Sequence, residues 1–421
     1  MMPTAGQQEA LDKLPVFLEH PTSRIFRLSG SAGTGKTYTS RQVPGMVTKG
    51  RVMGTAPTHK AVGVLQTQMP DVECRTIHSF LGLKPSRKNG VETLVRGSKY
   101  DPSEFYDVRV VTLDEASMVD PNILKYVEQD ISDWGRKYIA LGDRYQLPPV
   151  SSETSPIFDL LLAEDQQTEL TEIMRYAGPI IECATAVRDA IIQGVEPPYK
   201  SYLDENGAGV RCLRRDKWLS VLADITKHPE FTVNPDFSRV IAYRNQTVLE
   251  HIQSVRGFLG DDLSVPFQEG DFLVANEAWI QQDQVIFNTG AEFKVQATEP
   301  YTHPLYPELK GWQVWVEEYN ETPIYVLNIL QYLPMYKSIV ARLAEEAKQP
   351  GGSWIPYYDL REWFADLRPT YGITAHKAQG STFQNVFVDV KDMYKNPNKA
   401  EADRCLYVAI TRAAKNVFLL L

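Results

Sequence analysis

Cysteine is scarce in this 421-residue chain. Its four cysteines, Cys74, Cys183, Cys212 and Cys405, lie far apart, and no two form a C-x-x-C pair. We therefore expect neither a disulfide framework nor a cysteine-rich metal cluster, and a reducing, cytoplasmic environment suits the chain.

Long apolar runs and an excess of positive charge are also missing. No uninterrupted run approaches the length that crosses a bilayer, and residues 1–15 lack a signal-peptide apolar region, so we expect no membrane association. The formal net charge of −9 argues against indiscriminate binding to nucleic acid, although it leaves room for a basic groove on an acidic surface. The composition, 43% hydrophobic and 23% charged, is that of a soluble globular protein, and the length predicts two to four domains.

One glycine motif stands out, Gly30-Ser-Ala-Gly-Thr-Gly-Lys-Thr37, which fits the phosphate-binding pattern G-x-x-x-x-G-K-[ST]. Residues 25–28 predict a strand before it, and a helix is expected from Lys36. The glycines let successive N–H groups turn onto phosphate oxygens, and the helix N-terminus adds partial positive charge. Lys36 is expected on the β- and γ-phosphates and the Thr37 hydroxyl on Mg²⁺. A plain glycine-rich turn would not need the strand, the lysine and the threonine together, so the motif predicts a nucleoside-triphosphate site.

An acidic pair follows the apolar strand predicted over 108–113. Asp114 would hold Mg²⁺ through water while Glu115 polarises the attacking water. Such a pair is otherwise a common helix cap, but the glycine motif upstream favours the catalytic interpretation. Gln146, after another predicted strand over 137–141, is placed to bond a γ-phosphate or that water.

Other segments carry weaker signals. Loops at 57–61 and 76–80 hold Thr and His at strand ends, where a parallel sheet presents ligand contacts, although each also fits a helix N-cap. Residues 84–106 mix basic side chains, glycine and aromatics; a hairpin arm over 91–95 that contacts a polyanion and a solvated loop are both consistent with them. Residues 266–335 read as short strands split by turns, which predicts a small β-barrel.

Taken in order, these motifs resemble those of superfamily 1 helicases, specifically the phage Dda-type and RecD-like enzymes of the 5′→3′ branch. The resemblance covers almost the whole chain: GQQ, GSAGTGKT, APTHKA, TIHS, DEAS, GDRYQLPPV, ELTEIMR, TAHKAQGST and YVAITRA. It implies an α/β fold in which two RecA-like P-loop NTPase domains clamp ATP. The first domain would span 1–160, with a β-hairpin pin inserted at about 84–106. The second would combine 161–265 with 370–421, and 266–369 would form an inserted SH3-like β-barrel and its arm.

The resemblance also implies roles for residues. The implied catalytic set is Lys36, Glu115, Gln146, Arg175 and Arg412, with the last two arginines as arginine fingers from the second domain. Thr37 and Asp114 would hold Mg²⁺, while Gln7 and Tyr243 would contact adenine. The remaining implied nucleotide contacts are Gly30, Ser31, Ala32, Gly33, Thr34, Gly35, Lys36, Thr37, Tyr38 and Gly380.

The implied DNA contacts are Pro57, Thr58, His59, Thr76, His78, Leu94, Thr374, His376 and Gln379. Hydroxyl and backbone groups at such positions suit phosphates and carry no sequence information, so we expect sequence-tolerant binding. Counting from TIHS puts Leu94 near the tip of the pin, where Dda-type enzymes carry an aromatic residue. A leucine wedges between bases but does not stack on them as a ring does.

The implied activity is that of an ATP-dependent DNA helicase moving 5′→3′ on single-stranded DNA, with roles in replication, repair or recombination. Its implied partners are single-stranded DNA, duplex junctions and a single-strand-binding, replication or recombination protein. We expect a monomer, in the host cytoplasm if a phage encodes it. A single-strand translocase that displaces proteins and an RNA-acting helicase of the same superfamily remain as alternatives. A regulatory P-loop protein without a motor would not need an arginine on each side of a second sheet.

Overall fold

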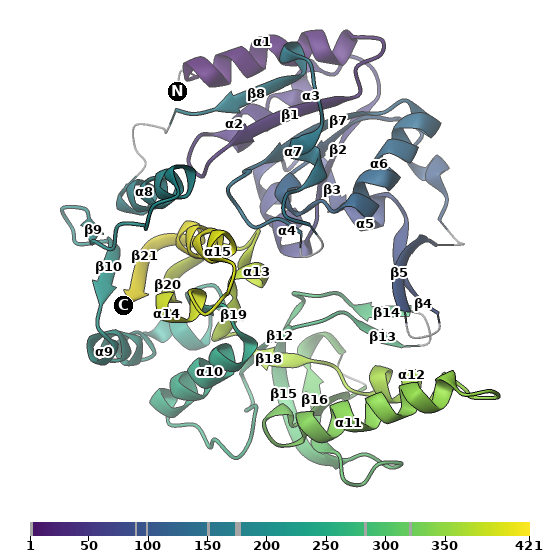
Figure 1. The fold of residues 1–421 in the computed structure, drawn as a ribbon, viewed down its shortest axis with the longest axis vertical. Helices are drawn as coiled ribbons and strands as arrows, with labels where there is room; N and C mark the ends of the chain where they lie inside the picture. The colour runs from purple at the N-terminus through teal and green to yellow at the C-terminus, as the bar shows by residue number, and fades with distance from the viewer. Residues whose placement is uncertain are drawn as a thin grey trace.

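The computed structural model describes residues 3–88, 91–97, 100–149, 152–172, 178–281, 284–319 and 322–421. Within these ranges the chain forms two six-stranded sheets, a five-stranded sheet and two two-stranded hairpins. Figure 1 shows the N-terminal six-stranded sheet at the top, the second at the lower left and the five-stranded sheet at the bottom. No helix in these ranges combines the length and apolar character that a membrane crossing needs.

The first sheet has the strand order β3-β2-β6-β7-β1-β8, and its neighbouring strands pair in parallel. Strands such as β6 are buried on both faces, which explains their continuous apolar sequences. The strands are β1 (Ile25–Gly30), β2 (Arg51–Ala56), β3 (Glu73–Thr76), β6 (Val108–Leu113), β7 (Lys137–Gly142) and β8 (Gln167–Leu170).

Helices cover both faces of the first sheet. One apolar cluster joins its strands to α1 (Ala5–Glu19), α3 (Val43–Met46) and α4 (His59–Gln68). A second cluster joins them to α5 (Ile77–Phe80), α6 (Pro121–Trp134) and α7 (Pro156–Asp159). The short helix α2 (Lys36–Ser40) begins directly after the glycine motif, as the sequence predicts.

The second six-stranded sheet has the order β19-β11-β20-β21-β10-β9 and is parallel except for β9. Its strands are β9 (Tyr202–Leu203), β10 (Gly209–Leu213), β11 (Ser238–Ala242), β19 (Gly372–Thr374), β20 (Phe383–Asp389) and β21 (Ala413–Leu420). Its helices are α8 (Pro179–Gln193), α9 (Arg215–Ile225), α10 (Asn245–Leu259), α13 (Ala375–Ala378), α14 (Val390–Met393) and α15 (Lys399–Thr411). Helices α8, α13 and α15 contribute side chains to one core cluster of this sheet. Helices α9 and α10 contribute to a second cluster.

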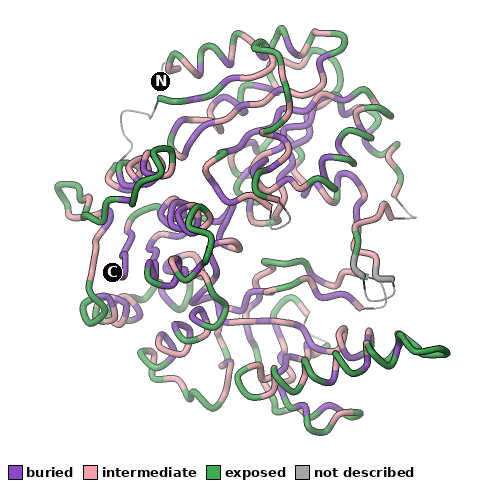
Figure 2. Tube along the Cα trace, in the orientation of Figure 1, coloured by how far each residue is buried: buried purple, intermediate pink, exposed green. Residues whose placement is uncertain are grey.

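Helix α15 has more buried residues than any other described helix of this sheet. Eight of its 13 residues are buried, from Ala402 to Ile410, and Figure 2 shows the buried stretch close to the first sheet's lower edge. A helix held on several sides presents its side chains in fixed directions. Those of α15 therefore serve as rigid contacts toward the first sheet.

An antiparallel sheet, β17-β16-β15-β12-β18, precedes the last strands of the second sheet. Its strands are β12 (Phe272–Ala275), β15 (Glu292–Thr302), β16 (Lys310–Val316), β17 (Ile324–Leu327) and β18 (Leu367–Pro369), with the hairpin β13 (Trp279–Gln281) and β14 (Gln284–Phe287) beside it. Helices α11 (Ile329–Lys348) and α12 (Ile355–Trp363) pack together over an aromatic cluster. The prediction of short strands over 266–335 is thus confirmed by the pairing of these strands.

A second hairpin projects from the first sheet. It pairs β4 (Leu83–Lys88) with β5 (Val91–Arg96), and the register runs from Leu83 opposite Arg96 to Lys88 opposite Val91. The predicted position of Leu94 at the tip is wrong, because Leu94 faces Pro85 in the middle of the hairpin. Its carbonyl oxygen accepts a hydrogen bond from the Tyr126 hydroxyl of α6 at 3.2 Å, so this part of the hairpin contacts α6 of the first sheet. Counting from TIHS failed because a hairpin's turn depends on its cross-strand register.

Candidate active site

The glycine motif forms a loop between β1 and α2. Gly33 and Gly35 have φ angles of 80° and 86°, which favour glycine, and a Cβ on Gly30 would lie 2.6 Å from the Thr34 hydroxyl oxygen. The Lys36 ammonium folds back over the loop and donates to the Gly30 and Ser31 carbonyl oxygens at 2.6 and 3.1 Å. The glycine loop and the Lys36 ammonium therefore lie together at the carboxyl end of β1.

Gln7 ties the first helix to this loop. It is buried, its side-chain nitrogen donates to the Thr34 carbonyl at 2.9 Å, and its side-chain oxygen accepts from the Thr4 N–H at 3.1 Å. Thr4 in turn caps α1 by accepting from the Gln7 N–H. Gln7 thus supports the phosphate loop, and its contact with adenine stays a prediction.

Asp114 and Glu115 follow β6 at the same edge of the sheet. Glu115 is the residue other than glycine that has a positive φ, 51°, among the described residues, a conformation that is strained and clusters at functional sites. Burial raises the pKa of both carboxyl groups, and the positive charges of Lys36 and Arg412 partly oppose this effect. These two cations therefore favour the ionised, metal-binding and base-competent forms of the pair.

The loop after β7 adds Asp143 and Gln146. Both are buried, and the Gln146 side-chain oxygen has no hydrogen-bond partner in the described structure. A buried amide oxygen without a partner is costly unless a ligand or water meets it. Asp143 is satisfied, since it accepts from the Tyr145 N–H at 3.0 Å and from the Tyr407 hydroxyl at 2.6 Å.

Arg412 reaches this edge from the second sheet. It is the C-cap of α15, and its guanidinium lies 3.8 Å from the Glu115 carboxylate. Its Nη1 also donates to the Ser381 carbonyl at 3.4 Å, whereas its Nε is buried and has no partner among the residues that the structure describes. Arg175, the other predicted arginine, lies outside the described residues.

Two further residues reach the phosphate loop from elements of the second sheet. Arg188 of α8 donates to the Ser31 hydroxyl at 2.8 Å, and the Tyr407 hydroxyl accepts from the Ala32 N–H at 3.2 Å. The sequence reasoning missed both. Tyr407 carried a signal, because a tyrosine inside a buried motif needs a partner for its hydroxyl. Arg188 carried none, since an arginine on an amphipathic helix is ordinarily solvated.

These groups fit a nucleoside triphosphate with Mg²⁺. Lys36, Arg188 and Arg412 supply positive charge, and Thr37 and Asp114 supply the oxygen ligands that Mg²⁺ prefers. The Gln146 side-chain oxygen and the Arg412 Nε are buried without a partner among the described residues, so each is available to a ligand or water. A cavity of about 190 Å³ beside the loop is lined by residues that include Gly30, Ser31, Asp143 and Arg188.

Several predicted DNA residues come together elsewhere, around a cavity of about 170 Å³ between the three sheets. Its lining includes Thr58, Thr374, His376 and Gln379. Gln379 is buried and donates to the Leu147 carbonyl at 3.0 Å, which links the second sheet to the loop after β7.

The threonines of this set act as helix caps. Thr58, Thr76 and Thr374 accept hydrogen bonds at the starts of α4, α5 and α13, and the N-cap interpretation of the loops at 57–61 and 76–80 is thus confirmed. Pro57 and His59 flank Thr58, and His78 follows Thr76; burial lowers the pKa of His78. Caps of this kind aim N–H groups outward, where an anion can bind.

Two residues that the resemblance assigns to the nucleotide lie beside residues that it assigns to DNA. A Cβ on Gly380, whose φ is 72°, would lie 3.0 Å from the Ala61 Cβ and 3.2 Å from the Thr58 hydroxyl. Gly380 thus allows the second sheet to approach α4 closely. The Tyr243 ring lies beside His376, with ring centroids 6.1 Å apart.

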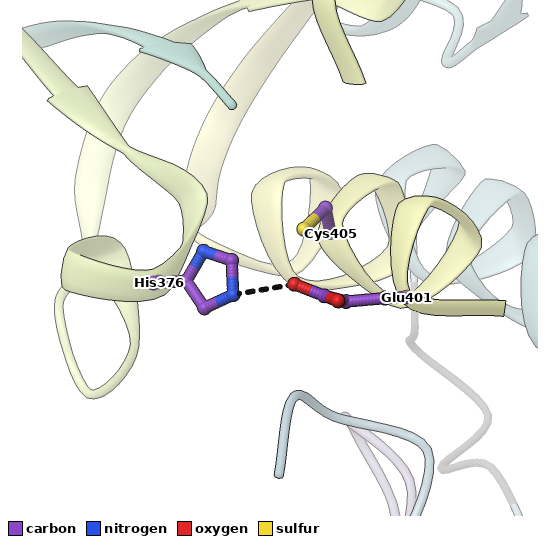
Figure 3. A group of neighbouring side chains, drawn as sticks. All are labelled: His376, Glu401 and Cys405. Atoms are coloured by element: carbon purple, nitrogen blue, oxygen red, sulfur yellow. Dashed lines mark hydrogen bonds and ion pairs between the residues drawn. The ribbon is translucent and has the colours of Figure 1, made fainter. Parts of the chain in front are cut away.

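His376 is oriented by α15. Its Nε2 lies 3.1 Å from the Glu401 carboxylate, and the Cys405 thiol is close by (Figure 3); their ligand atoms all lie within 4.8 Å of one another. Burial raises the pKa of Cys405 to about 12, so in this arrangement the thiol is a neutral neighbour of the His376–Glu401 pair. We interpret the cluster as the hydrogen bond that orients His376.

A network of ion pairs joins the three sheets next to the cavity that Thr58 and Thr374 line. Lys60 of α4 pairs with Asp236, just before β11, at 2.5 Å and with Glu292 of β15 at 3.0 Å. Arg239 of β11 also bonds Glu292 and lies over the Phe383 ring. Sequence reasoning missed these pairs because their members lie far apart in the chain.

Comparisons with known proteins agree with this arrangement. The family described as "AAA domain" matches residues 3–197, and the "UvrD-like helicase C-terminal domain" matches residues 369–420. The "ATP-dependent DNA helicase dda" of Enterobacteria phage T4 is 26% identical over 99% of this chain and 98% of its own length. The "Uncharacterized protein R530" of Acanthamoeba polyphaga mimivirus is 24% identical over 98% of both chains.

Solved structures share the fold. A Pif1 helicase structure concerned with DNA unwinding at forked double-stranded DNA has a TM-score of 0.53 at 17% identity, covering 100% of this chain and 92% of its own. Pif1 from Bacteroides, in complex with ADP-AlF3 and single-stranded DNA, has a TM-score of 0.50 at 16% identity with the same coverage. The two parallel sheets and the phosphate loop between them define a RecA-like P-loop helicase fold. These matches support a superfamily 1 helicase similar to Dda and Pif1.

Proposed function

We propose that this chain is an ATP-dependent DNA helicase that moves 5′→3′ along single-stranded DNA and separates duplexes. The observation that carries the proposal is the approach of Arg412, from the second sheet, to within 3.8 Å of Glu115, in the first. A site completed by both domains hydrolyses its nucleotide only when they are closed, which couples hydrolysis to movement. The relatives named as ATP-dependent DNA helicases support the activity and the substrate, and the direction comes from the resemblance of the motifs.

At the nucleotide site, bound ATP with Mg²⁺ supplies a phosphoryl group for transfer to water. Lys36 and the loop N–H groups would hold the phosphates, while Thr37 and Asp114 would hold the metal ion. Glu115 would accept the proton of the attacking water. Gln146 would orient that water, and Arg412, together with Arg175, would stabilise the charge that develops on the phosphoryl oxygens.

At the DNA site, the cavity between the three sheets would take the sugar–phosphate backbone. Its capped helix starts at Thr58 and Thr374 offer N–H groups to phosphates, which supports sequence-tolerant binding. Both six-stranded sheets contribute to the cavity, so closure at the nucleotide site would shift one set of contacts against the other.

The accessory elements have proposed roles as well. The order of five antiparallel strands supports an SH3-like barrel within 266–369, with α11 and α12 as its arm. The β4–β5 hairpin is the proposed strand-separating pin, inserted into a first domain of residues 1–160. The second domain would combine 161–265 with 370–421. Monomeric state, single-strand-binding or replication partners and a cytoplasmic location stay predictions from the resemblance.

The test is a pair of duplex substrates that each carry one single-stranded tail. Duplex DNA with only a 5′ single-stranded tail should be unwound in the presence of ATP and Mg²⁺, and duplex with only a 3′ tail should not. Binding to single-stranded DNA should weaken as salt rises, because phosphate contacts release counterions. Unwinding from the 3′ tail would refute the direction, and stimulation of ATP hydrolysis by RNA but not by DNA would refute the substrate.

A further inference from the structure

Tyr407 belongs to the second sheet's domain, yet its hydroxyl group lies against the first domain's phosphate loop. It donates to the Asp143 carboxylate at 2.6 Å and accepts from the Ala32 N–H at 3.2 Å. The Tyr407 side chain is fully buried, and Asp143 is 1% exposed. One hydroxyl therefore bridges α15 to two separate segments of the first domain.

The chemistry of the group suits this bridge. Burial and the Asp143 charge raise the pKa of Tyr407 well above its ordinary value, so the phenol keeps its proton. A protonated hydroxyl donates once and still accepts. Tyr407 thus satisfies the buried Asp143 and the Ala32 N–H at the same time.

Helix α15 touches the nucleotide site at two points. Tyr407 contacts the phosphate loop, and Arg412 at the end of the same helix lies beside Glu115. Because α15 is buried along most of its length, a change at one of these contacts moves the other.

We propose that Tyr407 is a positioning residue whose hydroxyl competes with nucleotide phosphate for the Ala32 N–H. This competition couples nucleotide binding at the phosphate loop to the contacts of α15. The reason is that loop N–H groups are the donors that phosphate oxygens use, and one N–H serves one strong acceptor. Without nucleotide, Tyr407 bonds Ala32 and Asp143 and so raises the share of molecules whose domains are closed. With nucleotide, the Tyr407 hydroxyl bonds Asp143 alone. Arg412 then stabilises the closed arrangement of the domains. This inference rests on the proposed ATP site.

The test compares Tyr407→Phe with a matched control, Tyr394→Phe. The Tyr394 hydroxyl also donates to a carboxylate, that of Asp403 at 2.6 Å, but both residues lie in the second domain. Fluorophores on the exposed residues Glu128 of α6 and Lys217 of α9 report the distance between domains by single-molecule energy transfer. Without nucleotide, the closed-to-open ratio should fall roughly tenfold in Tyr407→Phe, the scale of one hydrogen bond to a charged group. Tyr394→Phe should match the wild type.

A second measurement follows the Ala32 amide itself by hydrogen exchange. Without nucleotide, the peptide that carries Ala32 should exchange faster in Tyr407→Phe than in the wild type. With a non-hydrolysable ATP analogue the two should exchange alike, because phosphate then protects the amide in both. A general loss of structure would instead speed exchange throughout α15.

The outcomes separate the two proposals. If Tyr407→Phe matches the wild type in both distance and exchange without nucleotide, the bridge is overturned. If the Ala32 peptide stays unprotected in Tyr407→Phe when the analogue is bound, the competition is overturned. If the wild-type protein binds no fluorescent ATP analogue at all, the proposed function fails whatever the distances show.

Discussion

The guanidinium of Arg412 lies 3.8 Å from the carboxylate of Glu115, although the two residues belong to different six-stranded sheets. Glu115 is held in a positive-φ conformation after β6, and Arg412 ends a buried helix, so both are presented by rigid elements. The Glu115 side chain is 17% exposed, so the pair is partly shielded from water and the two charges influence one another. The first two predictions follow from this relationship.

Glu115→Gln should abolish turnover while ATP still binds. The amide keeps the size of the side chain but accepts no proton, and a positioned base contributes roughly a hundred- to ten-thousandfold to a rate. Lys36→Ala should instead weaken nucleotide binding as well, because it removes a phosphate-facing charge. Fluorescent-nucleotide titration alongside steady-state hydrolysis distinguishes the two, and near-wild-type turnover in both variants would remove the ATPase assignment.

Arg412→Gln should lower kcat by roughly a thousandfold or more, with a smaller effect on ATP affinity, as for other arginine fingers. The substitution should also change how kcat depends on pH. Burial raises the pKa of Glu115 and the Arg412 charge lowers it, so removing Arg412 raises that pKa further. Since the base works only when ionised, the acid limb of the residual rate should move to higher pH. Lys415→Gln, which removes an exposed positive charge on β21, is the control and should leave the limb in place.

Shortening the β4–β5 hairpin should separate unwinding from hydrolysis. Replacing residues 86–93 with an Asn-Gly turn keeps the Pro85–Leu94 pair and the bond from Tyr126 to Leu94. DNA-stimulated hydrolysis should persist, and strand separation should fall. Leu94→Ala should unwind nearly normally, because Leu94 lies in mid-hairpin. Loss of unwinding in Leu94→Ala alone would make that residue the wedge after all.

Lys137→Met should destabilise the first domain and change the pH dependence of its stability. The Lys137 ammonium donates to three carbonyl oxygens, those of Phe17, His20 and Ser23, at 2.6 to 2.8 Å. Burial lowers its pKa to about 8, whereas an unfolded lysine titrates near 10.4. Between these values the unfolded state binds more protons, so the free energy of unfolding of the wild type should rise with pH.

That rise should be missing from chemical denaturation curves of Lys137→Met. Lys125→Met, on the exposed face of α6, removes a solvated ammonium and should keep the wild-type slope. Equal slopes in all three proteins would show that Lys137 titrates normally.

Much of the site could be predicted from the sequence because its chemistry is local. The loop from Gly30 to Thr37 needs its glycines, lysine and threonine within eight consecutive residues, and its strand and helix flank it directly. The acidic pair after β6 and the capping threonines Thr58 and Thr374 are likewise settled by their neighbours in the chain. Order of motifs was enough to indicate the family.

Only the tertiary structure decided which distant groups meet. Tyr407 and Ala32 are 375 positions apart, and Lys60 reaches Glu292 across 232. The register of the β4–β5 hairpin, the neighbours of Gly380 and the partner of Gln7 also came from the tertiary structure. Sequence patterns report the periodicity and caps of single elements, whereas these contacts depend on how two sheets and a buried helix are oriented, which no short stretch of residues encodes.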